Sequence, residues 1–213
     1  MLIIFDLDGT LLNTIDDLTD AANYALWEYG FAPRSVDECR QFVGNGVTKL
    51  MERALPEKAR TPENLTRMRE LFLNYYDNHL WDKTHPYAGM RSILAALQTR
   101  GIKLAVASNK YQSATERLIQ HFFPQIPFVA VFGQRENVPV KPHPQLVADI
   151  LAVAGETREN TLYIGDSDVD MQTAQNAGVK ECAVTWGFKP REVLVACQPD
   201  YMIDTPQELV NLI

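Results

Sequence analysis

Cysteine is scarce in this 213-residue sequence, which contains only Cys39, Cys182 and Cys197. An odd number of cysteines without close-spaced pairs argues against a disulfide framework, and also against a zinc site. We therefore expect buried or incidental thiols.

Long hydrophobic runs are also missing. No run approaches the ~20 apolar residues that a membrane-spanning helix needs. The apolar stretch at the N-terminus is short, has no basic region before it and meets an acid at Asp6, which is not typical of a secretory signal. We expect no membrane association and a cytoplasmic location.

Basic residues are outnumbered: 20 Lys and Arg face 27 Asp and Glu, for a net charge of −7. This balance argues against a nucleic-acid surface, which needs clustered basic residues to meet phosphates. It does not exclude a small anionic substrate, because one metal ion can reverse the local charge. The length allows one core with a small additional domain.

Short all-apolar runs recur along the chain, as expected of strands covered on both faces in a parallel sheet. These runs are LIIF (2–5), KLAVAS (103–108), FVAVFG (128–133), TLYIGD (161–166) and ECAVTW (181–186). Helical patterns lie between most of them, at 91–101, 113–122, 144–155 and 169–178. The alternation predicts an α/β fold with a doubly wound, parallel-sheet, Rossmann-like core.

Residues 14–84 interrupt this alternation, because they contain no strand-like run and are dominated by helical patterns such as 16–30 and 65–80. SVDE (35–38) predicts a capping box, and TPEN (61–64) places Thr and Pro where a helix would begin.

We therefore expect two domains. Residues 1–13 and 85–213 form a discontinuous α/β domain, and residues 14–84 form a helical insertion.

Polar residues follow three of the predicted strands. Asp6 ends the first, Ser108 and Asn109 end the second, and Asp166 ends the TLYIGD strand. In open α/β sheets, ligands bind beyond the carboxyl ends of the strands. Lys141 lies in the proline-rich segment 138–144, which could hold an ammonium group near the same edge.

A second acid, Asp8, follows Asp6 closely, so Asp6, Asp8 and Asp166 could converge. Two carboxylates ~4 Å apart repel by roughly 4 kcal/mol at an effective dielectric constant of about 20. Three are tolerable only with a cation or with raised pKa values. Oxygen ligands with open positions suit Mg²⁺.

These residues resemble the four ordered motifs of the haloacid dehalogenase superfamily. The motifs are DLDGT (6–10), Ser108-Asn109, Lys141 and GDSDVD (165–170). The resemblance covers the whole chain, with the insertion in the place of that family's small helical cap domain. Within the superfamily the chain is most similar to the phosphoglycolate phosphatases, on the segments FVGNG (42–46), KPHP (141–144) and PDYMIDTPQEL (199–209).

The resemblance implies that Asp6 is a nucleophile that forms an aspartyl-phosphate. It implies that Asp8 is the general acid and base. Mg²⁺ would be held by the Asp6 carboxylate, the Asp8 main-chain carbonyl and Asp166.

The resemblance also implies roles around the phosphoryl group. Ser108 and the main-chain amide of Asn109 would bind its oxygens, and Lys141 would offset negative charge. Thr10 would help to bring main-chain amides to the phosphate. Asp170 would orient either metal-bound water or Lys141.

The insertion contains a glycine-rich loop, Gly44-Asn45-Gly46. It is either a flexible turn between helices or a segment whose amides cover the substrate when the cap closes. Lys49 and Arg53 are either solvated charges or contacts for a substrate carboxylate.

The expected activity is that of a Mg²⁺-dependent phosphatase acting on a small phosphorylated metabolite, with 2-phosphoglycolate as the best single substrate. The alternatives are a β-phosphoglucomutase-like hexose-phosphate mutase, and a pyrophosphatase or nucleotidase of the same fold. Such mutases usually carry an arginine in the cap loop, and residues 44–46 contain none. A further alternative is a signalling receiver that is phosphorylated on an aspartate, but receivers lack the long helical insertion. The expected state is a monomer or a homodimer.

Overall fold

The computed structural model describes all 213 residues, and the chain divides into two compact units. One consists of Met1–Asn13 and Pro86–Ile213, and the other of Thr14–His85. His85 thus belongs to the helical unit, one residue beyond the expected boundary. The two residues before it explain this placement, because the amides of Lys83 and Thr84 donate to the Asp17 carboxylate in the helical unit.

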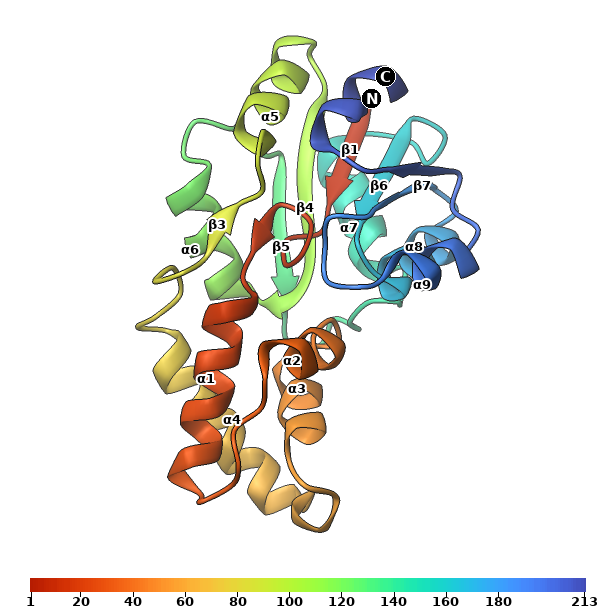
Figure 1. Cartoon of the computed structure of the whole chain (residues 1–213). Coiled ribbons are helices and arrows are strands. Elements are labelled where there is room, and N and C mark those ends of the chain that lie inside the picture. The colour runs from red at the N-terminus through yellow and green to blue at the C-terminus, as the bar shows by residue number, and fades with distance from the viewer. The chain divides into compact units, whose positions relative to one another are not determined.

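The first unit contains a six-stranded sheet in the order β5-β4-β1-β6-β7-β8, with every neighbouring pair parallel (Figure 1). The strands are β1 (Leu2–Phe5), β4 (Lys103–Tyr111), β5 (Ala130–Gln134), β6 (Thr161–Gly165), β7 (Lys180–Val184) and β8 (Tyr201–Ile203). This arrangement confirms the predicted doubly wound α/β fold.

Strand β1 lies at the centre of the sheet, and all four of its side chains are fully buried. Its last residue, Phe5, pairs with Val106 of β4 and with Ile164 of β6. Because parallel strands in this register end together, the residues that follow β1 and β6 and those near the end of β4 meet at one edge of the sheet.

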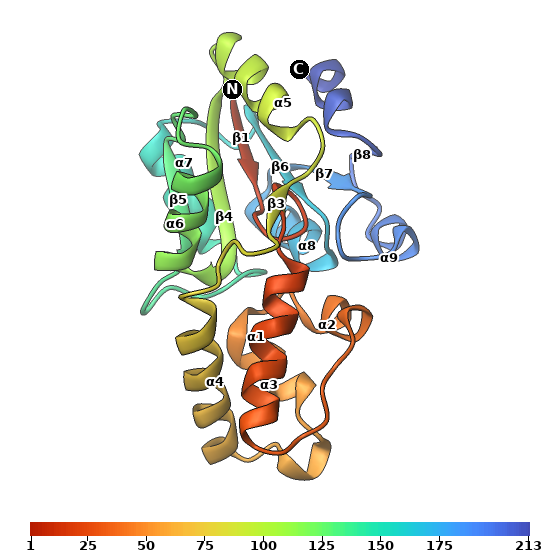
Figure 2. The same cartoon turned by 60° about the vertical axis from the view of Figure 1, so that its left-hand side comes forward.

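Helices lie on both sides of the sheet (Figures 1 and 2). They are α5 (Met90–Thr99), α6 (Gln112–Phe122), α7 (Gln145–Ala154), α8 (Asp168–Ala177), α9 (Arg191–Ala196) and the 3₁₀ helix η2 (Pro206–Leu212). Leu146, Val147 and Ile150 of α7 pack with Ala174 of α8 against buried residues of the sheet. Gly178, the last residue of the helical pattern predicted over 169–178, ends α8 in the left-handed conformation.

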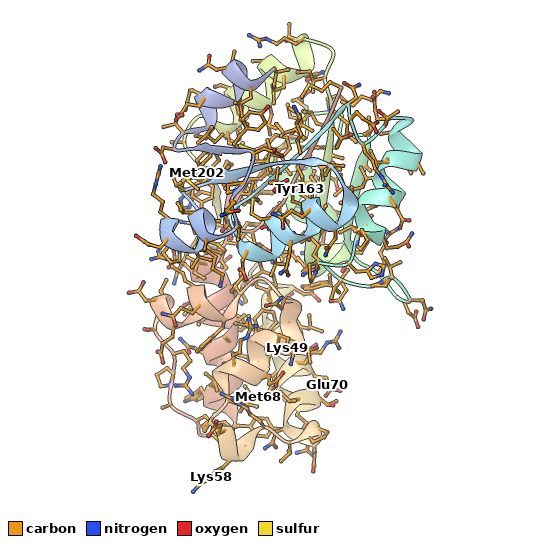
Figure 3. The ribbon with its side chains drawn as sticks, turned by 90° about the vertical axis from the view of Figure 1, so that its right-hand side faces the viewer. Lys49, Lys58, Met68, Glu70, Tyr163 and Met202 are labelled. Atoms are coloured by element: carbon orange, nitrogen blue, oxygen red, sulfur yellow. The ribbon has the colours of Figure 1, made fainter.

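The second unit is helical and contains α1 (Ile15–Glu28), α2 (Val36–Phe42), α3 (Gly46–Ala54), the 3₁₀ helix η1 (Glu57–Ala59) and α4 (Pro62–Tyr76). Ser35 and Glu38 form the predicted capping box. Thr61 caps α4, with Pro62 in the first turn. Met68, which is labelled in Figure 3, is one of the fully buried residues of α4.

Helix α4 ends at Tyr76, four residues before the end of the predicted helical pattern at residue 80. The amides of Asn78 and His79 bond to the carbonyls of Tyr75 and Tyr76, which closes the chain into turns. The helical spacing of apolar residues therefore extends four residues beyond the end of α4.

Two strands too short to show any sequence pattern, β2 (Leu12–Asn13) and β3 (His85–Pro86), pair where the chain leaves and re-enters the α/β unit. None of the helices in either unit combines the length and hydrophobicity required to span a lipid bilayer.

Candidate active site

Three acids gather beyond the carboxyl ends of β1 and β6. Asp6 follows β1 and its amide donates to the Ile164 carbonyl at 2.9 Å. One carboxylate oxygen each from Asp6, Asp166 and Asp170 lies within 4.8 Å of the others. The expected convergence of Asp6 and Asp166 is thus present in the structure, but the third carboxylate belongs to Asp170. The Asp8 carboxylate instead forms an ion pair with Lys110.

Lys141 is the buried counter-charge of this cluster and is only 2% exposed. Its ammonium lies 2.7 Å from Asp170 Oδ1 and 2.9 Å from Asp6 Oδ1. It also donates to the Ala107 carbonyl at 3.0 Å and to the Tyr163 hydroxyl at 3.2 Å. Burial is the largest effect on the pKa of Lys141 and lowers it, but Asp170 and Asp6 raise it well above its usual value. Lys141 is therefore charged at neutral pH.

The carboxylates carry more negative charge than Lys141 compensates. Burial, followed by repulsion from Asp170, raises the pKa of Asp6 well above its usual value, although Lys141 opposes the shift. Burial and Asp170 also raise the pKa of Asp166 to about 7, against the lowering effect of the Phe188 amide and the Thr10 hydroxyl. A buried set of oxygen donors with excess negative charge fits a hard divalent cation.

Both carboxylate oxygens of Asp166 accept a hydrogen bond. The Thr10 hydroxyl donates to its Oδ1 at 3.1 Å, and the Phe188 amide donates to its Oδ2 at 2.7 Å. The Thr10 amide bonds to the Leu7 carbonyl at 3.3 Å, and the Gly9 amide bonds to the Leu12 carbonyl at 2.8 Å. The Thr10 side chain therefore positions the Asp166 carboxylate, and the amides of Gly9 and Thr10 bond within the loop.

Gly9 lets this loop approach Asp166 closely. Its φ is +86°, and a Cβ at this position would lie 2.3 Å from Asp166 Oδ2. Gly101 has a similar φ of +74°, with open space around its missing Cβ. Alanine substitutions at these two glycines therefore separate the free-energy cost of backbone strain from that of steric overlap.

We expect Gly9→Ala to destabilise the protein by about 2–4 kcal/mol, through left-handed strain together with overlap against Asp166. Gly101→Ala should cost only about 1 kcal/mol, through strain alone. Denaturant unfolding of both variants measures the difference. Equal losses would show that Asp166 yields to the added methyl group.

Ser108, Asn109 and Lys110 occupy the part of β4 where its pairing with β5 shifts register. Asn109 Oδ1 accepts from the Lys141 amide at 2.8 Å, and Asn109 Nδ2 donates to the Lys141 carbonyl at 3.1 Å. This reciprocal pair fixes the main chain of Lys141. The Asn109 side chain is thus occupied in positioning Lys141, whereas the role that the resemblance implies belongs to its main-chain amide.

Asp170 links α8 to the cluster. Its Oδ2 accepts from the amide and the hydroxyl of Ser167, in a capping box at the start of α8. Its Oδ1 accepts from Lys141 and from the Tyr163 hydroxyl. Of the two roles left open for Asp170, these contacts favour the orientation of Lys141.

Sequence reasoning missed two residues of the site, Lys110 and Tyr163. A lysine at the end of a strand reads as a surface residue, whereas Lys110 is only 6% exposed. Tyr163 reads as an apolar strand residue, but its buried hydroxyl contacts both Lys141 and Asp170. Figure 3 shows Tyr163 within the α/β unit. The adjacent Ser-Asn motif was the only available signal for Lys110.

The helical unit contains the glycine-rich loop between α2 and α3. Gly44 and Gly46 both have positive φ, at +121° and +82°. Arg53 donates to the Phe42 carbonyl at 2.7 Å and to Asn45 Oδ1 at 2.9 Å. Arg53 therefore braces the loop internally.

Lys49, labelled in Figure 3, pairs with Glu52 at 2.6 Å. Both of the basic residues that the sequence analysis singled out in this unit thus have partners inside it.

The chain is similar to known proteins along most of its length. Residues 3–184 match the family model described as haloacid dehalogenase-like hydrolase. A phosphoglycolate phosphatase of Mesorhizobium japonicum is 34% identical over 196 residues, which cover 90% of this chain and 86% of that protein. A phosphoglycolate phosphatase of Aquifex aeolicus is 31% identical over 215 residues, which cover 99% of this chain and 95% of that protein.

Solved structures give the same result for the fold. A crystal structure from Lactobacillus delbrueckii subsp. bulgaricus superposes with a TM-score of 0.92 at 32% identity, covering 100% of this chain and 97% of that one. The similarity therefore includes both units.

Proposed function

This chain belongs to the haloacid dehalogenase-like hydrolases and is a phosphoric monoester hydrolase, and we propose that it hydrolyses 2-phosphoglycolate to glycolate and phosphate. The proposal includes Mg²⁺ dependence and an aspartyl-phosphate intermediate on Asp6. One observation carries it: an aspartate at the end of the central strand lies 2.9 Å from a buried lysine and among two further carboxylates.

In the proposed first step, a carboxylate oxygen of Asp6 attacks the phosphorus atom. The bond between phosphorus and the leaving oxygen breaks, and its electron pair stays on that oxygen, which takes a proton from Asp8. In the second step, water attacks the phosphorus of the aspartyl-phosphate and gives a proton to Asp8. The bond to Asp6 then breaks, which restores both acids.

Lys141 and Ser108 support these steps. The Lys141 ammonium lies beside Asp6, so it offsets negative charge on the nucleophile and on the transferring phosphoryl group. Ser108 is buried within the last part of β4, where pairing with β5 shifts register, and its hydroxyl would donate to a phosphoryl oxygen.

The Asp6 and Asp166 carboxylates and the Asp8 main-chain carbonyl would hold Mg²⁺. When bound, the ion supplies Lewis-acid stabilisation of the phosphoryl oxygens. The excess of buried carboxylates over ammonium groups supports this assignment.

The proposal also covers the role of the helical unit, the cellular location and the oligomeric state. The helical unit acts as a cap whose Gly44-Asn45-Gly46 loop contributes to selection of the leaving group. The enzyme acts in the cytoplasm, which is supported by three free cysteines in a chain without a disulfide. It works as a monomer or a homodimer.

A phosphate-release screen with Mg²⁺ tests the substrate. The panel contains 2-phosphoglycolate, β-glucose 1-phosphate, a nucleoside monophosphate and pyrophosphate. We expect kcat/KM for 2-phosphoglycolate to exceed the others by at least about tenfold, a difference of 1.4 kcal/mol in transition-state binding. A flat profile would contradict the assignment. Isomerisation of β-glucose 1-phosphate without phosphate release would favour the mutase.

Removal of divalent metal should abolish turnover. We expect EDTA to lower the rate by more than about 100-fold, because a bound metal contributes several kcal/mol to transition-state stabilisation. Excess Mg²⁺ should restore it.

Binding of Mg²⁺ should also stabilise the fold by about 2.7 kcal/mol at 100 times its Kd, which a thermal-shift titration measures without substrate. Asp166→Asn should remove most of this stabilisation. An unchanged Mg²⁺ shift in that variant would place the ion elsewhere.

A further inference from the structure

A second buried lysine, Lys110, lies at this edge of the sheet. Its side chain is only 3% exposed, and its ammonium is 3.2 Å from Asp8 Oδ1. An ammonium group leaves water at a high free-energy cost unless an opposite charge or hydrogen bonds compensate for it. The position of the Lys110 ammonium is therefore coupled to the Asp8 carboxylate.

The main chain on both sides of this pair is fixed. The Lys110 amide donates to Ser108 Oγ at 3.2 Å, and its carbonyl accepts from Thr115 Oγ1 at 3.3 Å. A Cβ at Gly133 would lie 2.5 Å from that carbonyl, so the neighbouring strand is in close contact. The main chain that carries the Lys110 side chain is thus held in place by these contacts.

The main chain of Asp8 is held in a closed loop. Its loop is closed by the bond from the Gly9 amide to the Leu12 carbonyl, and Asp8 itself bridges to Leu12. The Asp8 side chain is 12% exposed, and its Oδ1 lies 3.2 Å from the Lys110 ammonium. The ion pair thus constrains the orientation of this carboxylate.

The two buried lysines serve different acids. Lys141 contacts Asp6 and Asp170, whereas Lys110 contacts Asp8. A lysine that only offset the negative charge of the site could equally lie among Asp6, Asp166 and Asp170. Lys110 instead pairs with an acid that is not one of the three in the cluster, which indicates a role directed at Asp8.

We propose that Lys110 is a positioning residue that holds the Asp8 carboxyl in the orientation for proton transfer to the leaving oxygen. This inference rests on the proposed function, in which Asp8 is the proton donor. A displacement of 1 Å in a catalytic group can cost about 10²-fold in rate, so loss of the orienting contact should be readily measurable.

The test uses two substrates that differ in their need for a proton. The alkoxide leaving group of 2-phosphoglycolate requires protonation, whereas p-nitrophenolate leaves as a stable anion. The parameter compared is kcat/KM, since it contains only the steps up to departure of the leaving group. The variants are Lys110→Met, Asp8→Asn and the double variant. Lys103→Met, on the same strand and half-exposed, is the matched control.

We expect Lys110→Met to lower kcat/KM for 2-phosphoglycolate by about 100-fold, and for p-nitrophenyl phosphate by less than about fivefold. In the Asp8→Asn background, the same change should add less than about threefold. Lys103→Met should leave both values within about twofold. If Lys110→Met does not fold, Lys110→Gln enters the same comparison.

Equal losses on the two substrates, or an undiminished effect of Lys110→Met in the Asp8→Asn background, would overturn the inference. Either result would leave the proposed phosphatase activity standing, because wild-type turnover is measured in the same assay. Failure of the wild-type enzyme to hydrolyse 2-phosphoglycolate would instead contradict the proposed function.

Discussion

An Asp6→Asn variant is expected to lose at least about 10³-fold in steady-state phosphate release, because the amide cannot form the aspartyl-phosphate. Rapid mixing with 2-phosphoglycolate and Mg²⁺, followed by acid quench, should show phosphorylated protein for the wild type and none for the variant. Phosphate release at near wild-type rates would refute Asp6 as the nucleophile.

The loss in Asp6→Asn should come from chemistry and not from unfolding. A neutral side chain at this position relieves repulsion from Asp170 and Asp166, which together with burial raises the pKa of Asp6. We therefore expect the metal-free variant to be at least as stable as the wild type at neutral pH. Asp37→Asn, the same chemical change at an exposed position, should keep activity within about twofold.

Lys141→Met is expected to have the largest combined effect on stability and activity. It leaves Asp6 and Asp170 buried without their shared ammonium, which should destabilise the protein by about 3–5 kcal/mol. It also removes the charge beside the reacting phosphoryl group, worth about 10²–10³-fold in kcat. Denaturant unfolding and phosphate release measure the two losses, with Lys103→Met, at a half-exposed position, as the control.

The pH dependence of Lys141→Met distinguishes a charge effect from a packing effect. Lys141 opposes the raised pKa of Asp6, so its loss should raise that pKa further. A carboxyl group with a raised pKa in the folded state keeps a proton that the unfolded chain releases. Stability then falls as the pH rises above the unfolded value of about 4. The deficit of the metal-free variant should thus be smaller at pH 5 than at pH 8. An equal deficit at both values would indicate a packing defect.

The fold was predictable because its signals are local. The five apolar runs that predicted strands correspond to β1, β4, β5, β6 and β7, with ends that differ by up to three residues. Strands β2, β3 and β8 were not predicted, since two or three residues show no periodicity and depend on a partner strand.

The candidate site was predictable only in part. Strand ends indicated Asp6 and Asp166, because a parallel register brings such positions together. Spacing alone could not show that the loop after β1 directs the Asp8 carboxylate to Lys110, or that α8 brings Asp170 to Lys141. Those contacts depend on tertiary structure that no local pattern encodes.

The central place of β1 has a consequence for synthesis. This strand and Asp6 leave the ribosome before the two strands that flank β1, which begin at Lys103 and Thr161. Until both have emerged, this apolar strand lacks at least one of its two neighbours. The segment that would carry the nucleophile is thus translated well before it can be enclosed, and the nascent chain exposes its central strand until β6 has emerged.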